Sequence, residues 1–166
     1  SAAAIYGTRA SNGVIIITTK KGKSGKLKVN FSSVNSASTV IKKVDVLSAD
    51  EFRAIVNASG TAAQKAMLGT ANTDWQDEIY QTALATNNNI SVSGGIGNLP
   101  YRVSLGFQHQ EGVLKTDKLQ KTSLAIVLNP VLFNNHLKID LNLKGSAENT
   151  RFAAGVVGGA ITFDPT

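Results

Sequence analysis

The chain has 166 residues, enough for one domain with a hydrophobic core, since domains commonly run to about 100 to 150 residues. Hydrophobic residues make up 42% of it, yet no run approaches the ~20 apolar residues that a membrane-spanning helix needs, which excludes a helical membrane protein. The lack of cysteine excludes disulfides and thiolate metal sites, and the net charge of +6 comes from mostly dispersed lysines without interleaved aromatics, so we expect no nucleic-acid partner.

The first part of the chain predicts turns and one short strand. Gly7 and the pair Asn12-Gly13 suit tight turns, because glycine and asparagine accept positive φ at low cost. The β-branched run VIIITT at residues 14–19 has the length of a buried strand. Residues 20–26 are polar and rich in lysine, which predicts a flexible exit from that strand.

A further strand is predicted at residues 26–32. Within it the sequence LKVNFS alternates between apolar and polar side chains, the period of a strand with one apolar side. Val34 breaks this alternation, so we expect a bulge or the end of the strand near Ser33.

Residues 37–88 have a helical period and predict a long connection that contains short helices. Ser48 and Glu51 form a capping box ahead of apolar positions in residues 52–56, which predicts one amphipathic helix. A helix is also expected at residues 62–68. Helices this short are not stable alone in water, so their apolar sides must dock on something.

A second capping box is read at residues 73–76, TDWQ. Trp75, Ile79 and Ala83 follow four residues apart, which predicts a helix of about two turns. We interpret this stripe as packing and not as a ligand platform. The carboxylates at the helix start are interpreted as complementing the helix dipole and not as acid and base catalysts: Asp74, Asp77 and Glu78.

The rest of the chain predicts a meander of strands. The clearest strand is YRVSLGFQ at residues 101–108, where apolar and polar side chains alternate without exception. The other predicted strands are residues 90–96, 124–128 and 137–144. Residues 97–100, GNLP, form a short turn, and the sequence after Gly145 is loop-like to the end.

Such strands occur both in a soluble sandwich and in a membrane barrel. The connections between them are expected to be long, short, medium, short and long in turn. Outer-membrane barrels have this alternation, because their turns are short on the periplasmic side and their loops are longer outside. The pattern therefore favours an antiparallel transmembrane barrel.

No catalytic, cofactor or metal site is predicted. His109 and His136 lie in different hairpins without a cysteine or a carboxylate pair nearby. No residue is a credible nucleophile with its base. We therefore expect a protein that is not an enzyme.

Residues 2–23, AAAIYGTRASNGVIIITTKKGK, closely resemble the end of the plug domain in TonB-dependent outer-membrane receptors of the SusC/RagA family. The plug motif is carried by Tyr6, Gly7, Arg9, Asn12 and Gly13, which we interpret as structural residues. Residues 73–95 resemble the approach to the second barrel strand in the same family.

The resemblance implies a mostly β fragment of a larger protein. Residues 1–25 would end the plug, and residues 26–166 would begin the barrel with about five strands and a long helical loop at about 37–88. It also implies TonB-driven uptake of an oligosaccharide or peptide across the bacterial outer membrane, with a SusD-like surface lipoprotein as partner. The TonB-binding segment would lie upstream.

In this arrangement Leu105 and Phe107 would face lipid, while polar residues would face a wet lumen. The expected lumen-facing residues are Arg102, Ser104, Gln108, Lys138, Asp140 and Asn142. The alternative is a soluble all-β module that binds carbohydrate or protein and turns its apolar sides into a sandwich core.

Overall fold

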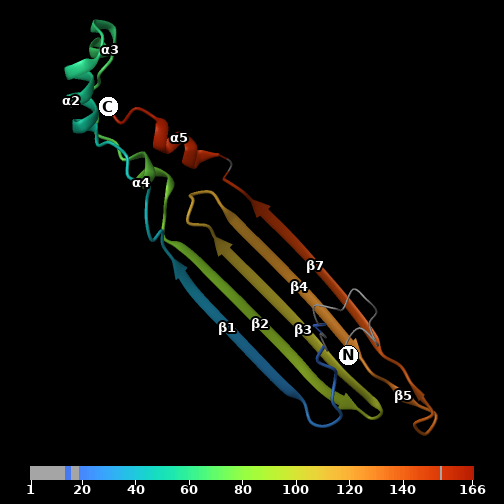
Figure 1. Ribbon diagram of the computed structural model, residues 1–166. Helices are drawn as coiled ribbons and strands as arrows, with labels where there is room; N and C mark the ends of the chain where they lie inside the picture. The colour runs from blue at the N-terminus through green and yellow to red at the C-terminus, as the bar shows by residue number, and fades with distance from the viewer. Residues whose placement is uncertain (1–13, 16–18, 154) are drawn as a thin grey trace.

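One five-stranded antiparallel sheet makes up most of the structure, a computed structural model that describes residues 14–15, 19–153 and 155–166. The sheet order is β1 (Lys28–Ser38), β2 (Ala83–Ile96), β3 (Leu99–Glu111), β4 (Lys118–Leu128) and β7 (Leu141–Arg151). Short helices gather beyond one end of the sheet, and the small strands β5 (Val131–Leu132) and β6 (Leu137–Lys138) lie at the other end (Figure 1). The predicted meander is thus confirmed.

The strand pairing is regular along β1, so the bulge or strand end expected near Ser33 was wrong. Ser33 pairs with Asn88, Val34 pairs with Asn87, and the register continues unchanged to Ser38. The pairing of β1 with β2 depends on backbone groups and not on the side-chain pattern. Val34 lies on the side of the sheet opposite to Val29 and Phe31, where its side chain is exposed and is tolerated.

β2, β4 and β7 each reach further toward the helices than the sequence predicted. They extend to Ala83, Lys118 and Arg151 at that end. Near the helices, β4 and β7 carry mostly polar residues on both sides, so their hydrophobic alternation fades while the backbone ladder continues. The segment after Gly145, expected as a loop, is therefore a strand as far as Arg151.

The fifth sheet strand starts later than residue 137. Phe133, Asn134 and Asn135 all take positive φ. They close the two-stranded hairpin of β5 and β6, which removes residues 137 and 138 from the sheet. The connection at 129–140 is consequently longer than that at 112–117, so the expected order of medium and short was reversed. The turn between β2 and β3 is short as predicted, with Gly97 at φ 57°.

The helices are α2 (Ala49–Ser59), α3 (Ala62–Ala66), α4 (Trp75–Ile79) and α5 (Val156–Thr162). The predicted capping box of Ser48 and Glu51 starts α2, with the Ser48 N–H 2.9 Å from the Glu51 carboxylate. The helix α4 is capped by Asp74 and not by Thr73, and it ends before Ala83, which begins β2. The helix α5 was missed because two glycines interrupt a segment without a side-chain cap.

The described residues form almost no hydrophobic core. The buried hydrophobic residues are Ala49, Ala83 and Val127, and no large side chain is fully buried. The core that the chain length allowed is therefore not present in the described ranges. Val14, Ile15 and Thr19 lie outside any strand, and the rest of the predicted strand at 14–19 falls outside the described residues. None of the described helices has the length and hydropathy to cross a membrane.

Candidate functional surfaces

The two faces of the sheet carry different side chains. Alternate residues of a strand point to opposite faces, and directly paired residues point to the same face, so the register assigns every strand position to a face. Two neighbouring rows hold apolar residues or glycine across all five strands: Val29, Val92, Val103, Ile126 and Leu143, then Phe31, Ile90, Leu105, Leu124 and Gly145. We call this side the apolar face.

The apolar face has no covering layer among the described residues. Leu105 is 49% exposed, Phe107 46% and Leu143 53%. Each sheet strand packs against its neighbours in the sheet, and the helices pack among themselves at one end (Figure 1). Within the described ranges, the face that a sandwich would bury is therefore open.

The height of the apolar face agrees with a membrane. Apolar positions on β3 run from Leu99 to Phe107, a length of about 27 Å at ~3.4 Å per residue. With a strand tilt of about 40° this is about 20 Å of height, close to the ~25 Å apolar band of outer-membrane barrels. Beyond Phe107 the same face becomes polar at His109, toward the helical end.

The opposite side, which we call the polar face, holds most of the predicted lumen residues. Arg102, Ser104, Gln108 and Asn142 all lie on it. The Arg102 guanidinium donates to Ser91 Oγ at 2.8 Å, so part of this face is an ordered polar network.

The other predicted site residues lie elsewhere. Lys138 is in β6, and Asp140 is in the connection before β7, so neither belongs to the five-stranded sheet. The plug-motif residues lie outside the described part of the chain: Tyr6, Gly7, Arg9, Asn12 and Gly13.

The N-terminal approach to β1 lies against the polar face, at the end of the sheet away from the helices. A Cβ on Gly95 would point to the polar face and would come within 2.9 Å of Ser24 Cα. A Cβ on Gly22 would come within 2.6 Å of the backbone nitrogen of Tyr101. Both contacts require glycine, because each places one backbone directly on another.

Asn129 joins this N-terminal approach to the connection before β7. Its side-chain oxygen accepts from the Gly22 N–H at 3.2 Å, and its amide nitrogen donates to Asp140 at 2.6 Å. Lys21 Nζ lies 2.7 Å from the other oxygen of Asp140. Hydrogen bonds from Lys21 and Asn129 lower the pKa of the Asp140 carboxyl. No pattern in the sequence indicated this network, since Lys21 and Gly22 are more than 100 residues away from Asn129 and Asp140.

At the opposite end, residues 39–82, which contain α2 to α4, and the segment after β7, which contains α5, form what we call the helical cap. Gln76 is only 2% exposed, and its amide pairs with both backbone groups of Val44, accepting at 3.0 Å and donating at 2.7 Å. Trp75 Nε1 donates to the Asp164 carbonyl at 2.8 Å, and its ring meets Phe163 edge to face at 5.2 Å. The Gln76 contact lies within the β1–β2 connection, and the Trp75 contacts join this connection to the segment after β7.

Carboxylates in the cap are stabilised in their charged form. Burial opposes ionisation of Asp74, but the backbone N–H groups of Asp77 and Gln76 and the Lys43 ammonium together lower its pKa. Hydrogen bonds from Ser48 lower the pKa of Glu51. The hydrogen bond to Asp77 raises the pKa of Lys43, with Asp74 adding to the effect.

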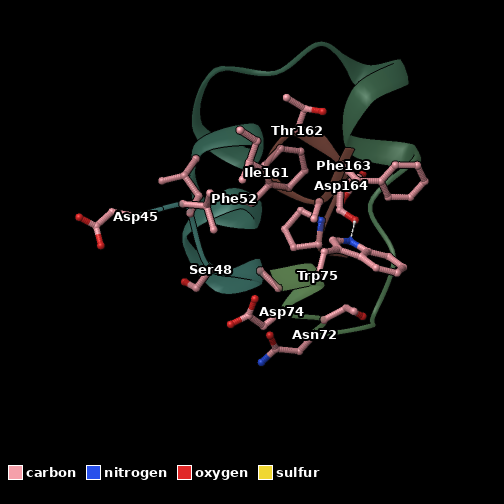
Figure 2. Close-up of a pocket in the computed structure, with 16 residues that line it drawn as sticks. Asp45, Ser48, Phe52, Asn72, Asp74, Trp75, Ile161, Thr162, Phe163 and Asp164 are labelled. Carbon is pink, nitrogen blue, oxygen red and sulfur yellow. Dashed lines mark hydrogen bonds between the residues drawn. The ribbon is translucent and has the colours of Figure 1, made fainter. Parts of the chain in front are cut away.

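A cavity of about 620 Å³ lies within the cap. Figure 2 shows Phe52 on one side of it and Trp75 with Asp164 on another, and its residues come from α2, α4, the end of α5 and the connecting segments beside these helices. The indole of Trp75 is held by Phe163 and Asp164, which agrees with its interpretation as a packing residue. Across the described ranges, histidines and carboxylates do not gather in the threes that a metal site would need.

Comparison with known proteins found relatives along the whole chain. It is 48% identical over 169 residues to the TonB-dependent receptor SusC of Bacteroides thetaiotaomicron, covering 100% of this chain and 17% of that receptor. It is 38% identical over 145 residues to the TonB-dependent receptor P3 of Formosa agariphila, covering 87% of this chain and 14% of the relative. The chain thus spans less than a fifth of the length of these relatives. No family model matches it.

Solved structures share the fold. The RagAB peptide importer in its closed-closed state aligns with a TM-score of 0.70 at 24% identity, covering 91% of this chain and 21% of that one. The RagAB peptide transporter aligns with a TM-score of 0.72 at 22% identity, covering 97% and 23%.

Proposed function

Because the chain belongs to the SusC/RagA family of TonB-dependent receptors, which are outer-membrane transporters and not enzymes, we propose that it forms one side of an uptake barrel. Residues 1–25 would complete the plug, and residues 26–166 would supply the first five strands of the wall. The long helical loop at about 37–88 would lie outside the cell.

The observation that carries this proposal is the contrast between the two faces of one sheet. The apolar face is uncovered over about the height of a membrane, and the polar face carries Arg102, Ser104, Gln108 and Asn142. The N-terminal approach to β1 also lies on the polar face, where a plug inside a barrel would have to be. Two independent features therefore favour the same inside and outside.

The edges of the sheet support a larger barrel. In the described residues β1 and β7 each pair with one neighbour only. Lipid offers no hydrogen bonds to an open strand edge, so these strands need partners when the sheet spans a membrane. Strands beyond this chain would supply them, which agrees with the small share of each relative that the chain spans.

The connections suggest the orientation. The tight turn at Gly97 and the hairpin of β5 and β6 would face the periplasm, while the helical cap would face outward (Figure 1). In outer-membrane barrels the longer loops are extracellular. The 39–82 connection is the longest in the sheet, so its position favours this orientation.

The proposed cargo is an oligosaccharide or a peptide, moved with energy from the TonB complex. A SusD-like surface lipoprotein is the proposed partner that helps to capture it. The solved structures with this fold include the RagAB peptide importer, which supports a peptide as the cargo.

Uptake by cells tests the proposal. Cells that produce the full-length protein should accumulate a labelled oligosaccharide or peptide pool, and a protonophore or deletion of TonB should abolish this uptake while surface binding persists. Deletion of a gene for a SusD-like lipoprotein should weaken capture. Uptake that ignored both the protonophore and TonB would contradict the proposed function.

A further inference from the structure

The N-terminal approach to β1 is joined to the five-stranded sheet and its connections by more contacts than a simple linker requires. Asn129 uses three groups at once. Its backbone N–H donates to the Pro100 carbonyl at 2.9 Å, its side-chain oxygen accepts from Gly22, and its side-chain nitrogen donates to Asp140. Gly22 offers an N–H donor and Asp140 offers a carboxylate acceptor, so together they define which end of the Asn129 amide is oxygen. The Asn129 side chain therefore joins Gly22 to Asp140 in one defined orientation.

Close backbone contacts act together with the Asn129 side chain. The Gly95 N–H donates to the Gly25 carbonyl at 3.1 Å, which holds the chain just before β1. Gly22 lies on the start of β3 with no room for a side chain. Residues 21–25 are thus fixed to β2, to β3 and to the connection after β4.

This placement matters for a pull on the chain from its N-terminal side. In the described residues β1 pairs with β2 alone, beginning at Lys28. A pull that reached Lys28 would load the β1 ladder from its first residue pair, so the pairs would oppose it one after another. A junction that ends the pull before Lys28 would pass the load to three neighbouring elements instead.

We propose that Asn129 and Asp140 are positioning residues that hold residues 21–25 on the wall, so that movement of the plug ends before the first barrel strand. The proposal rests on the proposed function for its source of force. Asn129 carries most of the effect, since Lys21 and Asp140 are each more than half exposed and such ion pairs contribute little.

Tryptic cleavage of the full-length protein in detergent micelles tests the proposal. Lys23 and Lys26 are cleavage sites inside or beside the held segment. Cleavage follows the population of the open form when opening is fast, so its rate reports the hold. Asn129→Ala should raise cleavage after these lysines by about tenfold, and Asp140→Ala by about threefold.

Asn98→Ala is the matched control, because Asn98 lies at the same end of the sheet and its contact to Val131 uses its backbone carbonyl. Its cleavage rate should stay at the parental value. Lys21→Arg should also keep the parental rate, since it keeps the cation beside Asp140. If Asn129→Ala reduces assembly in the membrane, Asp140→Ala decides alone, because it removes an exposed side chain.

Uptake separates holding from general stability. At equal surface amounts, the Asn129→Ala protein should bind cargo with an unchanged dissociation constant and import it several-fold more slowly. Unchanged cleavage in both Asn129→Ala and Asp140→Ala would overturn the proposal. If cleavage rises in the variants but the parental protein itself imports no cargo, the role of Asn129 and Asp140 in holding residues 21–25 is supported and the proposed function is contradicted.

Discussion

The sheet and the helical cap are stabilised in different ways. The sheet has five strands in continuous register, and its side chains need only be apolar on one face and polar on the other. The cap depends on individual contacts, such as the Gln76 amide on the Val44 backbone and the Trp75 indole on Asp164. The effect of a substitution in the sheet on stability should therefore depend on the face that the residue occupies. In the cap it should depend on the contact that the residue loses.

A charge on the apolar face should destabilise the protein most. Leu105→Arg in the full-length protein should cost up to about 4 kcal/mol, because it places a charge inside the apolar band of the apolar face. Gln108→Arg, three positions along the same strand on the polar face, should be tolerated. Reversible unfolding in lipid vesicles measures both, and equal losses would refute the assignment of the faces.

The second effect concerns a partner in the cap. Gln76→Ala removes a buried side chain and both of its hydrogen bonds to the Val44 backbone, and should cost about 1 to 3 kcal/mol in total. Hydrogen exchange across residues 39–82 of the full-length protein would report it as faster local opening. Gln110→Ala, an exposed glutamine at the end of β3, should leave the exchange unchanged. Equal exchange in the two variants would show that the Gln76 contact is not needed.

A smaller effect is expected at the start of α4. Asp74→Ala removes the cap that accepts from the N–H groups of Gln76 and Asp77, at a cost of about 1 kcal/mol. Asp74→Asn keeps a capping oxygen and should recover most of that stability. The same exchange experiment distinguishes them, and no difference between the two substitutions would mean that charge and not capping is the contribution of Asp74.

Acid should weaken the cap more than the sheet. The pKa values of Asp74 and Glu51 are lower in the folded protein than their ordinary values of 3.8 and 4.5. Their contribution is therefore complete above those ordinary values and is lost as the pH falls through the folded pKa values. Exchange in the cap should rise below about pH 4, while exchange in the centre of β3 stays constant. A parallel rise in both regions would contradict this difference.

The sequence predicted the sheet well where one face is apolar. Residues 101–108 alternate strictly, and β3 was predicted near its true position because periodicity alone assigns both strand and face. Prediction stopped short at Lys118 and Arg151, because strand ends with polar residues on both faces carry no such period. The local capping box at Ser48 was also predicted correctly.

The contacts that place the functional surfaces were beyond local patterns. Gln76 and Val44 are 32 residues apart, and Gly22 and Asn129 are 107 apart. Such pairs depend on the register of the whole sheet, which brings distant turns to one end. Asp140 has the parity of a lumen-facing strand residue, yet the hairpin of β5 and β6 takes it out of the sheet and toward Lys21.

In the membrane, the apolar face should meet lipid and the polar face should meet water. Single cysteines at Leu105 and Gln108, in a full-length protein without other cysteines, test it directly in outer-membrane vesicles. We predict that the cysteine at position 105 reacts with a lipid-soluble maleimide and not with a charged one, and that the cysteine at position 108 shows the reverse preference. Equal labelling of the two positions by the charged reagent would contradict the account.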